Sequence, residues 1–176
     1  AWNETNRSLA ATYVDTGFTV LALDMRGHGI SGGQVLGLGW YERNDIRAAV
    51  DLLLATGFAP GRIGIHGTSY GAATALLATA AIPEIGAVIA DSSWSDIRAI
   101  MDVEIEDRTG MPAAVARWLR PGISLTGRIV FSLDFDEISP LLAVPLIAPR
   151  PILFIHGEAD SRISVEHSEA LFDITL

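Results

Sequence analysis

Four short segments of the chain are almost continuously apolar, without the in-and-out alternation of a half-buried strand. They are residues 19–24, 62–66, 86–91 and 151–156. Strands of a parallel sheet have this pattern, because helices cover both faces of such a sheet. The pattern therefore predicts four buried, parallel strands.

Segments with helical periodicity lie between these strands. One helix is expected over residues 5–16, and another over residues 69–81, ending near Pro83. A further helix is predicted by apolar residues that recur on one face, with Gly57 as its expected C-cap. These apolar residues are Ile46, Ala49, Val50, Leu53 and Leu54. Alternating strands and helices predict an α/β fold with a doubly wound, mostly parallel sheet.

Residues 94–145 interrupt this alternation. The segment is too long for a simple connection, so we expect a cap-like insertion between the last two strands. It would lie over the carboxyl edge of the sheet, within a single domain that spans residues 1–176. Trp94 and Trp118 would form apolar walls of a substrate pocket, or else pack in the core of the insertion.

The composition excludes several classes of function. Of the 176 residues, 49% are hydrophobic, and the formal net charge is −9, which argues against nucleic acid or an anionic membrane as partner. The chain holds no cysteine, and no apolar run is long enough to span a bilayer. No group of His, Asp or Glu has the spacing of metal ligands, so we expect no metal and no other cofactor. The compartment is not identified, although the cytoplasm is favoured.

A serine in a glycine-bounded motif follows the second predicted strand. Residues 67–71 read Gly67-Thr68-Ser69-Tyr70-Gly71 and open the helix at residues 69–81. Between a strand and a helix, Gly-X-Ser-X-Gly is a nucleophile elbow, a strained turn that exposes the serine hydroxyl. Both glycines are expected where strand and helix pack too closely for side chains. A phosphate loop is the alternative, but the lysine it needs is missing. Ser69 is therefore the predicted nucleophile.

A carboxylate and backbone donors would complete the catalytic site. Asp160, in the loop after the last predicted strand, is expected to orient a catalytic histidine. Asp91, at the end of the preceding strand, is the alternative carboxylate. The backbone N–H of Tyr70 would be one oxyanion-hole donor, and Trp2 or Asn3 could supply the second.

The catalytic histidine is the missing part of this interpretation. It should follow the acid in the chain, and only His167 follows Asp160. His167 lies in a helix-like segment, where we expect a solvated side chain. His66 and His156 stand at strand ends beside glycines and are expected to form local hydrogen bonds. His28 precedes the serine and is a minor alternative.

Three motifs together resemble the α/β-hydrolase superfamily. Residues 24–33 are similar to its Asp-X-Arg-Gly-X-Gly-X-Ser loop, residues 67–71 to its elbow, and residues 156–160 to its His-Gly-X-X-Asp acid loop. Asp24 and Arg26 are expected to bond across the first loop. The chain looks most similar to serine hydrolases of the serine aminopeptidase-like and prolyl-oligopeptidase-like branch.

The resemblance implies a serine hydrolase that cleaves a carboxylic ester through an acyl-enzyme. Its substrate would be a small acyl compound or a short peptide. The superfamily has further strands before the first helix and a histidine beyond the acid loop, so we expect a fragment that lacks both. A serine peptidase of the same fold is one alternative, and a non-catalytic binding protein with this fold is another.

Overall fold

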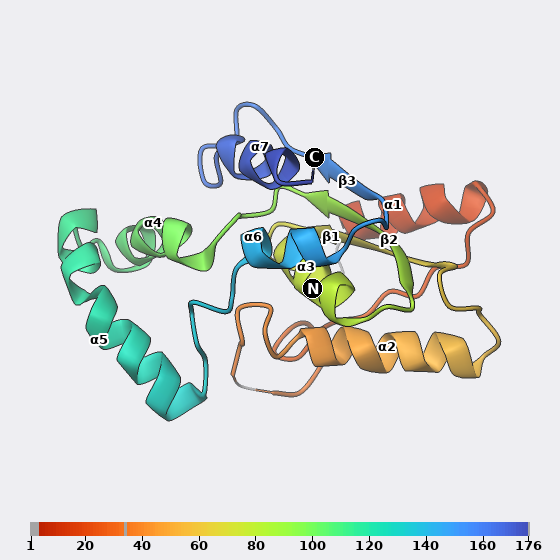
Figure 1. Cartoon of the computed structure of the whole chain (residues 1–176), viewed down its shortest axis with the longest axis horizontal. Coiled ribbons are helices and arrows are strands. Elements are labelled where there is room, and N and C mark those ends of the chain that lie inside the picture. Colours follow the sequence, from red (N-terminus) through yellow and green to blue (C-terminus); the bar gives the residue numbers. More distant parts are fainter. Residues whose placement is uncertain (1–3, 34, 176) are drawn as a thin grey trace.

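One parallel sheet of three strands forms the centre of the computed structural model, which describes residues 4–33 and 35–175 (Figure 1). The strands are β1 (Ile63–Thr68), β2 (Ile85–Asp91) and β3 (Ile152–Ile155), in the order β1-β2-β3. Thr68 lies opposite Asp91, and Asp91 lies opposite Ile155. The three strands therefore end level with one another at their carboxyl edge.

α3 (Tyr70–Ala81) follows β1 almost directly and packs across one face of the sheet. Every residue from 72 to 79 is buried. This is because α2 (Arg43–Ala55) and α6 (Pro140–Ala143) also contact the helix. A helix that is apolar all round is stable only in such an interior position.

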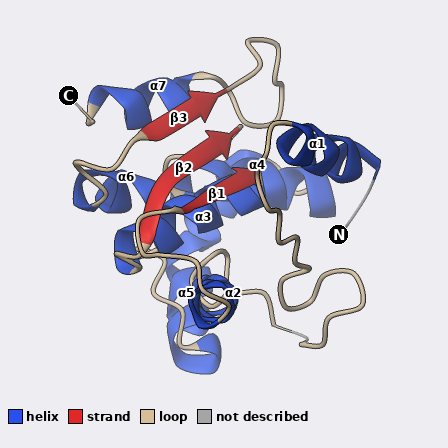
Figure 2. Ribbon diagram, turned by 90° about the vertical axis from the view of Figure 1, so that its right-hand side faces the viewer, coloured by secondary structure: helices blue, strands red, loops and turns tan. Residues whose placement is uncertain are grey.

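α1 (Glu4–Asp15), which Figure 2 shows near the end of β1, reaches the opposite face of the sheet through the side chain of Tyr13. Successive side chains of a strand point to opposite faces. Ile65 of β1 packs against the cluster that includes α3, whereas His66 bonds the hydroxyl of Tyr13 in α1 at 2.7 Å. The sheet therefore has helices on both faces, as a doubly wound arrangement requires.

Three of the four predicted strands are confirmed as β1, β2 and β3. The prediction for residues 19–24 is wrong, because the structure places them outside the sheet. A strand forms only where a neighbour pairs with its backbone groups, and no described strand pairs with this segment. Its apolar side chains stay accessible, with Leu21 exposed by 41% and Leu23 by 44%.

The three predicted helices are confirmed as α1, α2 and α3. α2 buries Ile46 and Val50 from the predicted apolar face. Its C-cap is Thr56 rather than the predicted Gly57, which follows one residue later with a φ of 102°, a value that glycine adopts without strain.

Residues 94–145 form helices that extend to one side of the sheet (Figure 1). α4 (Ile97–Thr109) and α5 (Ala113–Phe131) pack on each other, and a 3-10 helix (Val144–Leu146) follows α6 before β3. One hydrophobic cluster joins this segment to α3. It includes Ala73, Leu77, Trp94, Ile97, Ile100, Phe135 and Ile138. That the segment serves as a cap stays a prediction.

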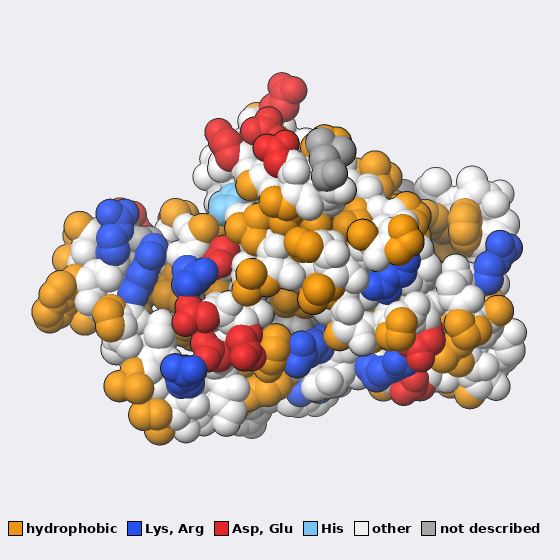
Figure 3. All heavy atoms as spheres, in the orientation of Figure 1, with side chains coloured by type: hydrophobic (Ala, Val, Ile, Leu, Met, Phe, Trp, Pro, Cys, Tyr) orange, Lys and Arg blue, Asp and Glu red, His pale blue; other side chains and the backbone are white. Residues whose placement is uncertain are grey.

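Acidic side chains gather over α7 (Glu166–Asp173), the helix after β3, on the face drawn in Figure 3. Glu166 and Glu169 lie in its first turn. Within the described residues, no helix combines the length and the apolar character needed to cross a membrane. The acidic surface agrees with the negative formal charge of the chain.

Replacing Leu76 by alanine should destabilise the protein strongly. Leu76 is fully buried between α3 and the sheet, so Leu76→Ala should lower the free energy of unfolding by about 2–5 kcal/mol. Urea unfolding would measure the loss, with Leu52→Ala as control, because Leu52 of α2 is 54% exposed. Equal effects of the two substitutions would contradict the position of α3 in the core.

Candidate active site

Ser69 connects β1 to α3 in a backbone conformation that residues other than glycine rarely adopt. Its φ is 55° and its ψ is −117°, a region that costs about 1–3 kcal/mol. Its N–H donates to the carbonyl oxygen of Asp91 at 2.7 Å, and its own carbonyl oxygen accepts from Ala72 at 2.9 Å. Ser69 is exposed at the carboxyl edge of the sheet. This is the geometry expected of a nucleophile elbow.

The two glycines of the elbow differ in what they accommodate. A Cβ on Gly67 would overlap the carbonyl oxygen of Gly71, so the strand and the helix approach each other as expected. The expectation is wrong for Gly71, because a Cβ there would meet no described atom within 4 Å. Close packing therefore requires glycine only at residue 67.

Tyr70 begins α3, and its side chain is anchored in the interior. No carbonyl group of the helix can accept from its N–H, because the first-turn donors of a helix have no internal partner. Its hydroxyl accepts from the N–H of Gly39 at 3.1 Å, and its ring contacts the ring of Trp94 edge-on. Burial raises the pKa of the Tyr70 phenol well above its usual value, and the nearby Glu42 carboxylate adds to this effect. No local sequence pattern indicated this role for the phenol.

The two candidate carboxylates lie at the same sheet edge as the elbow. Asp160 Oδ1 accepts from the N–H groups of Arg162 at 2.9 Å and Ile163 at 3.0 Å, and these bonds lower the pKa of Asp160. Asp91 ends β2, and its Oδ1 accepts from the hydroxyl of Ser92 at 3.2 Å. An ionised carboxylate that the backbone orients could hold a histidine. That Asp160 rather than Asp91 is this carboxylate stays a prediction. Among the described side chains, no group of three or more His, Asp or Glu is placed to bind a metal ion.

His156 and His167 are held by hydrogen bonds within the C-terminal part of the fold. His156 Nε2 donates to the carbonyl oxygen of Ile163 at 2.7 Å, so its Nδ1 accepts from the hydroxyl of Ser168 at 2.6 Å. His167 Nδ1 accepts from both the N–H and the hydroxyl of Ser95, at 3.3 and 2.8 Å. The local role expected for His156 is confirmed. The prediction that His167 is solvated is wrong, because this side chain is half-buried and burial lowers its pKa.

His66 and His28 also have local partners. His66 Nδ1 bonds Tyr13, as expected for a local hydrogen-bonding residue, and burial lowers the pKa of His66. His28 Nδ1 donates to the carbonyl oxygen of Arg26 at 3.0 Å, and its ring lies 5.7 Å from that of Tyr70. Within the described part of the chain, no histidine is hydrogen-bonded to the elbow serine.

Arg26 pairs with Asp45 of α2 rather than with Asp24. The guanidinium Nη2 lies 2.6 Å from Asp45 Oδ1, and the backbone N–H of Arg26 donates to Oδ2 of the same carboxylate at 3.0 Å. The expected bond between Asp24 and Arg26 is therefore wrong. Instead, the carbonyl oxygen of Asp24 accepts from the hydroxyl of Ser31 at 2.6 Å, which closes the loop. The loop is thus fastened to α2.

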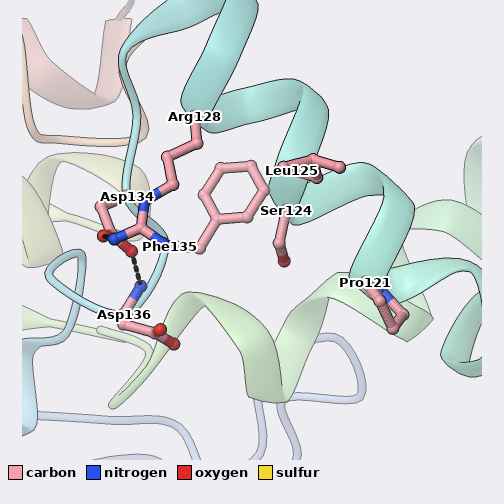
Figure 4. Close-up of a pocket in the computed structure, with 7 residues that line it drawn as sticks. All are labelled: Pro121, Ser124, Leu125, Arg128, Asp134, Phe135 and Asp136. Carbon is pink, nitrogen blue, oxygen red and sulfur yellow. Dashed lines mark hydrogen bonds and ion pairs between the residues drawn. The ribbon is translucent and has the colours of Figure 1, made fainter.

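The two tryptophans proposed as pocket walls differ in burial, and the two residues proposed as the second oxyanion donor are not among the described residues. Trp94 is buried in the core, Trp118 on α5 is 80% exposed, and Trp2 and Asn3 lie outside the described residues. A hollow of about 220 Å³ lies between residues 121–128 of α5 and the turn at residues 134–136 (Figure 4). No residue of the elbow lines it.

The contrast between the two glycines can be tested directly. Gly67→Ala should force β1 and α3 apart and destabilise the protein by about 1–3 kcal/mol, because an added methyl group has no space there. Gly71→Ala should be neutral or stabilising, since alanine is the better helix former and its Cβ meets nothing. Urea unfolding of both variants gives the comparison. Equal losses would contradict the close approach at Gly67.

Stability should fall as the pH falls below about 6.5, the usual pKa of histidine. Burial lowers the pKa of both His66 and His167, so the unfolded chain binds protons at a higher pH than the folded protein. This stabilisation is complete above the unfolded pKa and is lost as the pH falls toward the folded values. Urea midpoints between about pH 7.5 and pH 5.5 would show the loss. His167→Asn should flatten the dependence, and an unchanged slope would exclude a contribution from His167.

The chain matches a described family and longer relatives. Residues 1–106 match the family described as X-Pro dipeptidyl-peptidase (S15 family). The uncharacterized protein YqkD of Bacillus subtilis (strain 168) is 35% identical over 164 residues, which cover 92% of this chain and 52% of that protein. The chain spans about half the length of the curated relatives it matches.

Two solved structures have the same arrangement of strands and helices. The Pyrococcus furiosus esterase Pf2001 aligns with a TM-score of 0.71 at 24% identity, over 97% of this chain and 61% of that one. The alpha/beta hydrolase GrgF from Penicillium sp. sh18 aligns with a TM-score of 0.69 at 17% identity, over 97% and 72%. These likenesses confirm the predicted α/β-hydrolase fold. The match over its first 106 residues shows that the chain belongs to the X-Pro dipeptidyl-peptidase (S15) family.

Proposed function

We propose that the protein is a serine hydrolase that cleaves a carboxylic ester, with Ser69 as its nucleophile. The conformation of Ser69, with a φ of 55°, carries this proposal. Glycine would adopt this conformation with less strain, so the hydroxyl rather than the backbone favours serine here. Strained residues that surrounding structure holds in place are concentrated at functional sites.

The reaction would proceed through a covalent acyl-enzyme. Ser69 Oγ attacks the acyl carbon and loses its proton to a general base, and the resulting tetrahedral oxyanion accepts from the N–H of Tyr70. When the intermediate collapses, the ester C–O bond breaks and the leaving alkoxide takes the proton from the base. Water then attacks the acyl-enzyme in the same way and releases the acid. Tyr70 suits its role because its N–H points out of the first turn of α3.

The base that we propose is a histidine of the longer protein. His156 is engaged through both ring nitrogens, and Nδ1 of His167 is occupied by Ser95. The relatives are about twice as long as this chain, which leaves room for another histidine. Asp160 would orient it and stabilise its protonated form, because backbone donors keep this carboxyl ionised.

Peptide hydrolysis is the second candidate, favoured by the description of the matched family as X-Pro dipeptidyl-peptidase. A serine peptidase would use the same nucleophile, acid and oxyanion donor, so the site itself does not separate the two reactions. A non-catalytic binding protein is less favoured, because it would have no use for a strained serine at residue 69.

Replacing the nucleophile should abolish turnover. In the whole protein, Ser69→Ala should lower kcat/KM for p-nitrophenyl acetate by at least about a thousandfold, because no other group forms the acyl-enzyme. Ser132→Ala is the matched control: Ser132 also has a positive φ, 49°, but it is the C-cap of α5 and not part of the candidate site. It should keep most of the activity. Equal losses in both variants, or full activity of Ser69→Ala, would contradict the proposal.

A second substrate separates ester from peptide cleavage. The same proteins would be assayed with glycyl-prolyl-p-nitroanilide, whose anilide bond reports peptidase activity. A higher kcat/KM for the ester supports the proposal, and a higher kcat/KM for the anilide supports the peptidase. In either case the activity should depend on Ser69.

A further inference from the structure

Glu42 is a fully buried carboxylate close to the elbow. Its exposed fraction is 0%, which is unusual for a glutamate unless its oxygens are bonded. Oε1 accepts from the N–H of Gly37 at 2.7 Å, and Oε2 accepts from the N–H of Gly39 at 2.9 Å. Because both oxygens accept, Glu42 fixes the backbone of the loop at residues 37–42.

This loop is pressed against α3, the helix that follows the elbow. Gly39 has a φ of 92°, and a Cβ there would come 3.1 Å from Leu77 and 3.2 Å from Thr74, both in α3. Such contacts leave little freedom for the loop to shift without moving the helix. The position of the loop and that of α3 are therefore coupled.

Tyr70 makes this coupling specific to the elbow. Its hydroxyl accepts from Gly39 N–H at 3.1 Å, and the same N–H donates to Oε2 of Glu42 at 2.9 Å. Its ring centroid lies 5.7 Å from that of Trp94 and 5.7 Å from that of His28. The Tyr70 phenol is thus held by a loop that lies about thirty residues earlier in the sequence.

We infer that Glu42 is a positioning residue of the active site, which acts through the Tyr70 phenol to hold the Tyr70 N–H beside Ser69. The inference rests on the proposed function, since it concerns the oxyanion donor of that site. The phenol and the N–H belong to one residue, so releasing the phenol frees the first turn of α3. A displacement of about 1 Å in a catalytic group can cost on the order of a hundredfold in rate.

The test measures how fast a fluorophosphonate labels Ser69 in the whole protein, followed by intact mass. Glu42→Gln places an NH₂ group where one backbone N–H needs an acceptor, and it should slow labelling about tenfold or more. Tyr70→Phe keeps the ring and removes only the hydroxyl, so it tests the same link if the glutamine variant fails to fold. It should slow labelling in the same direction. The double variant should be no slower than the slower single variant, because both act through one contact.

Glu84→Gln is the matched control. Glu84 also pairs with α2, through Arg47 at 2.9 Å, but it follows the far end of α3. It should label at the wild-type rate. Amide hydrogen exchange of peptides that contain Tyr70 gives a readout independent of chemistry: exchange should be faster in Glu42→Gln and Tyr70→Phe, and unchanged in Glu84→Gln.

Each outcome decides a separate point. Wild-type labelling rates in both Glu42→Gln and Tyr70→Phe would overturn the inference while leaving the proposed function intact. If the two substitutions slow labelling independently, so that their fold losses multiply in the double variant, Glu42 does not act through Tyr70. Failure of the folded wild-type protein to be labelled at Ser69 would overturn the proposed function, and the inference would fall with it.

Discussion

The close approach of β1 and α3 at Gly67 is the constraint on which the site depends. Because no side chain fits between Gly67 and the carbonyl group of Gly71, the chain must turn from strand to helix within one residue. Ser69 occupies that residue and takes a positive φ. Its N–H bonds the end of β2, so the turn is fixed to the sheet as well as to the helix. The strain, about 1–3 kcal/mol, is offset by the burial of α3.

The features that could be predicted from the sequence are those with a local cause. β1, β2 and β3 are short apolar runs, α2 has one apolar face, and the elbow has fixed spacing. The strand expected at residues 19–24 shows the limit of this approach. Apolar composition indicates that a segment tends to be buried, but a strand also needs a partner, and composition carries no information on pairing. The steric role assigned to Gly71 was wrong for a similar reason, since it depends on what lies nearby in space.

The contacts that anchor the site could not be predicted, because they join residues far apart in the chain. Tyr70 bonds Gly39, Arg26 bonds Asp45, and His167 bonds Ser95, without any periodicity or motif linking the partners. Glu42 is the clearest case. A glutamate next to an amphipathic helix is expected at the surface, and only its two backbone partners explain why it is buried. Side chains close to the nucleophile are thus held in place by segments outside the Gly-X-Ser-X-Gly motif.

The most direct test of this account is to map the covalent adduct after treatment of the whole protein with a fluorophosphonate. The reagent reacts with activated serines, and tandem mass spectrometry of the digested protein identifies the modified residue. The account predicts one adduct, on Ser69. An unmodified protein would contradict it, and so would an adduct on another serine, such as Ser95, which already bonds His167.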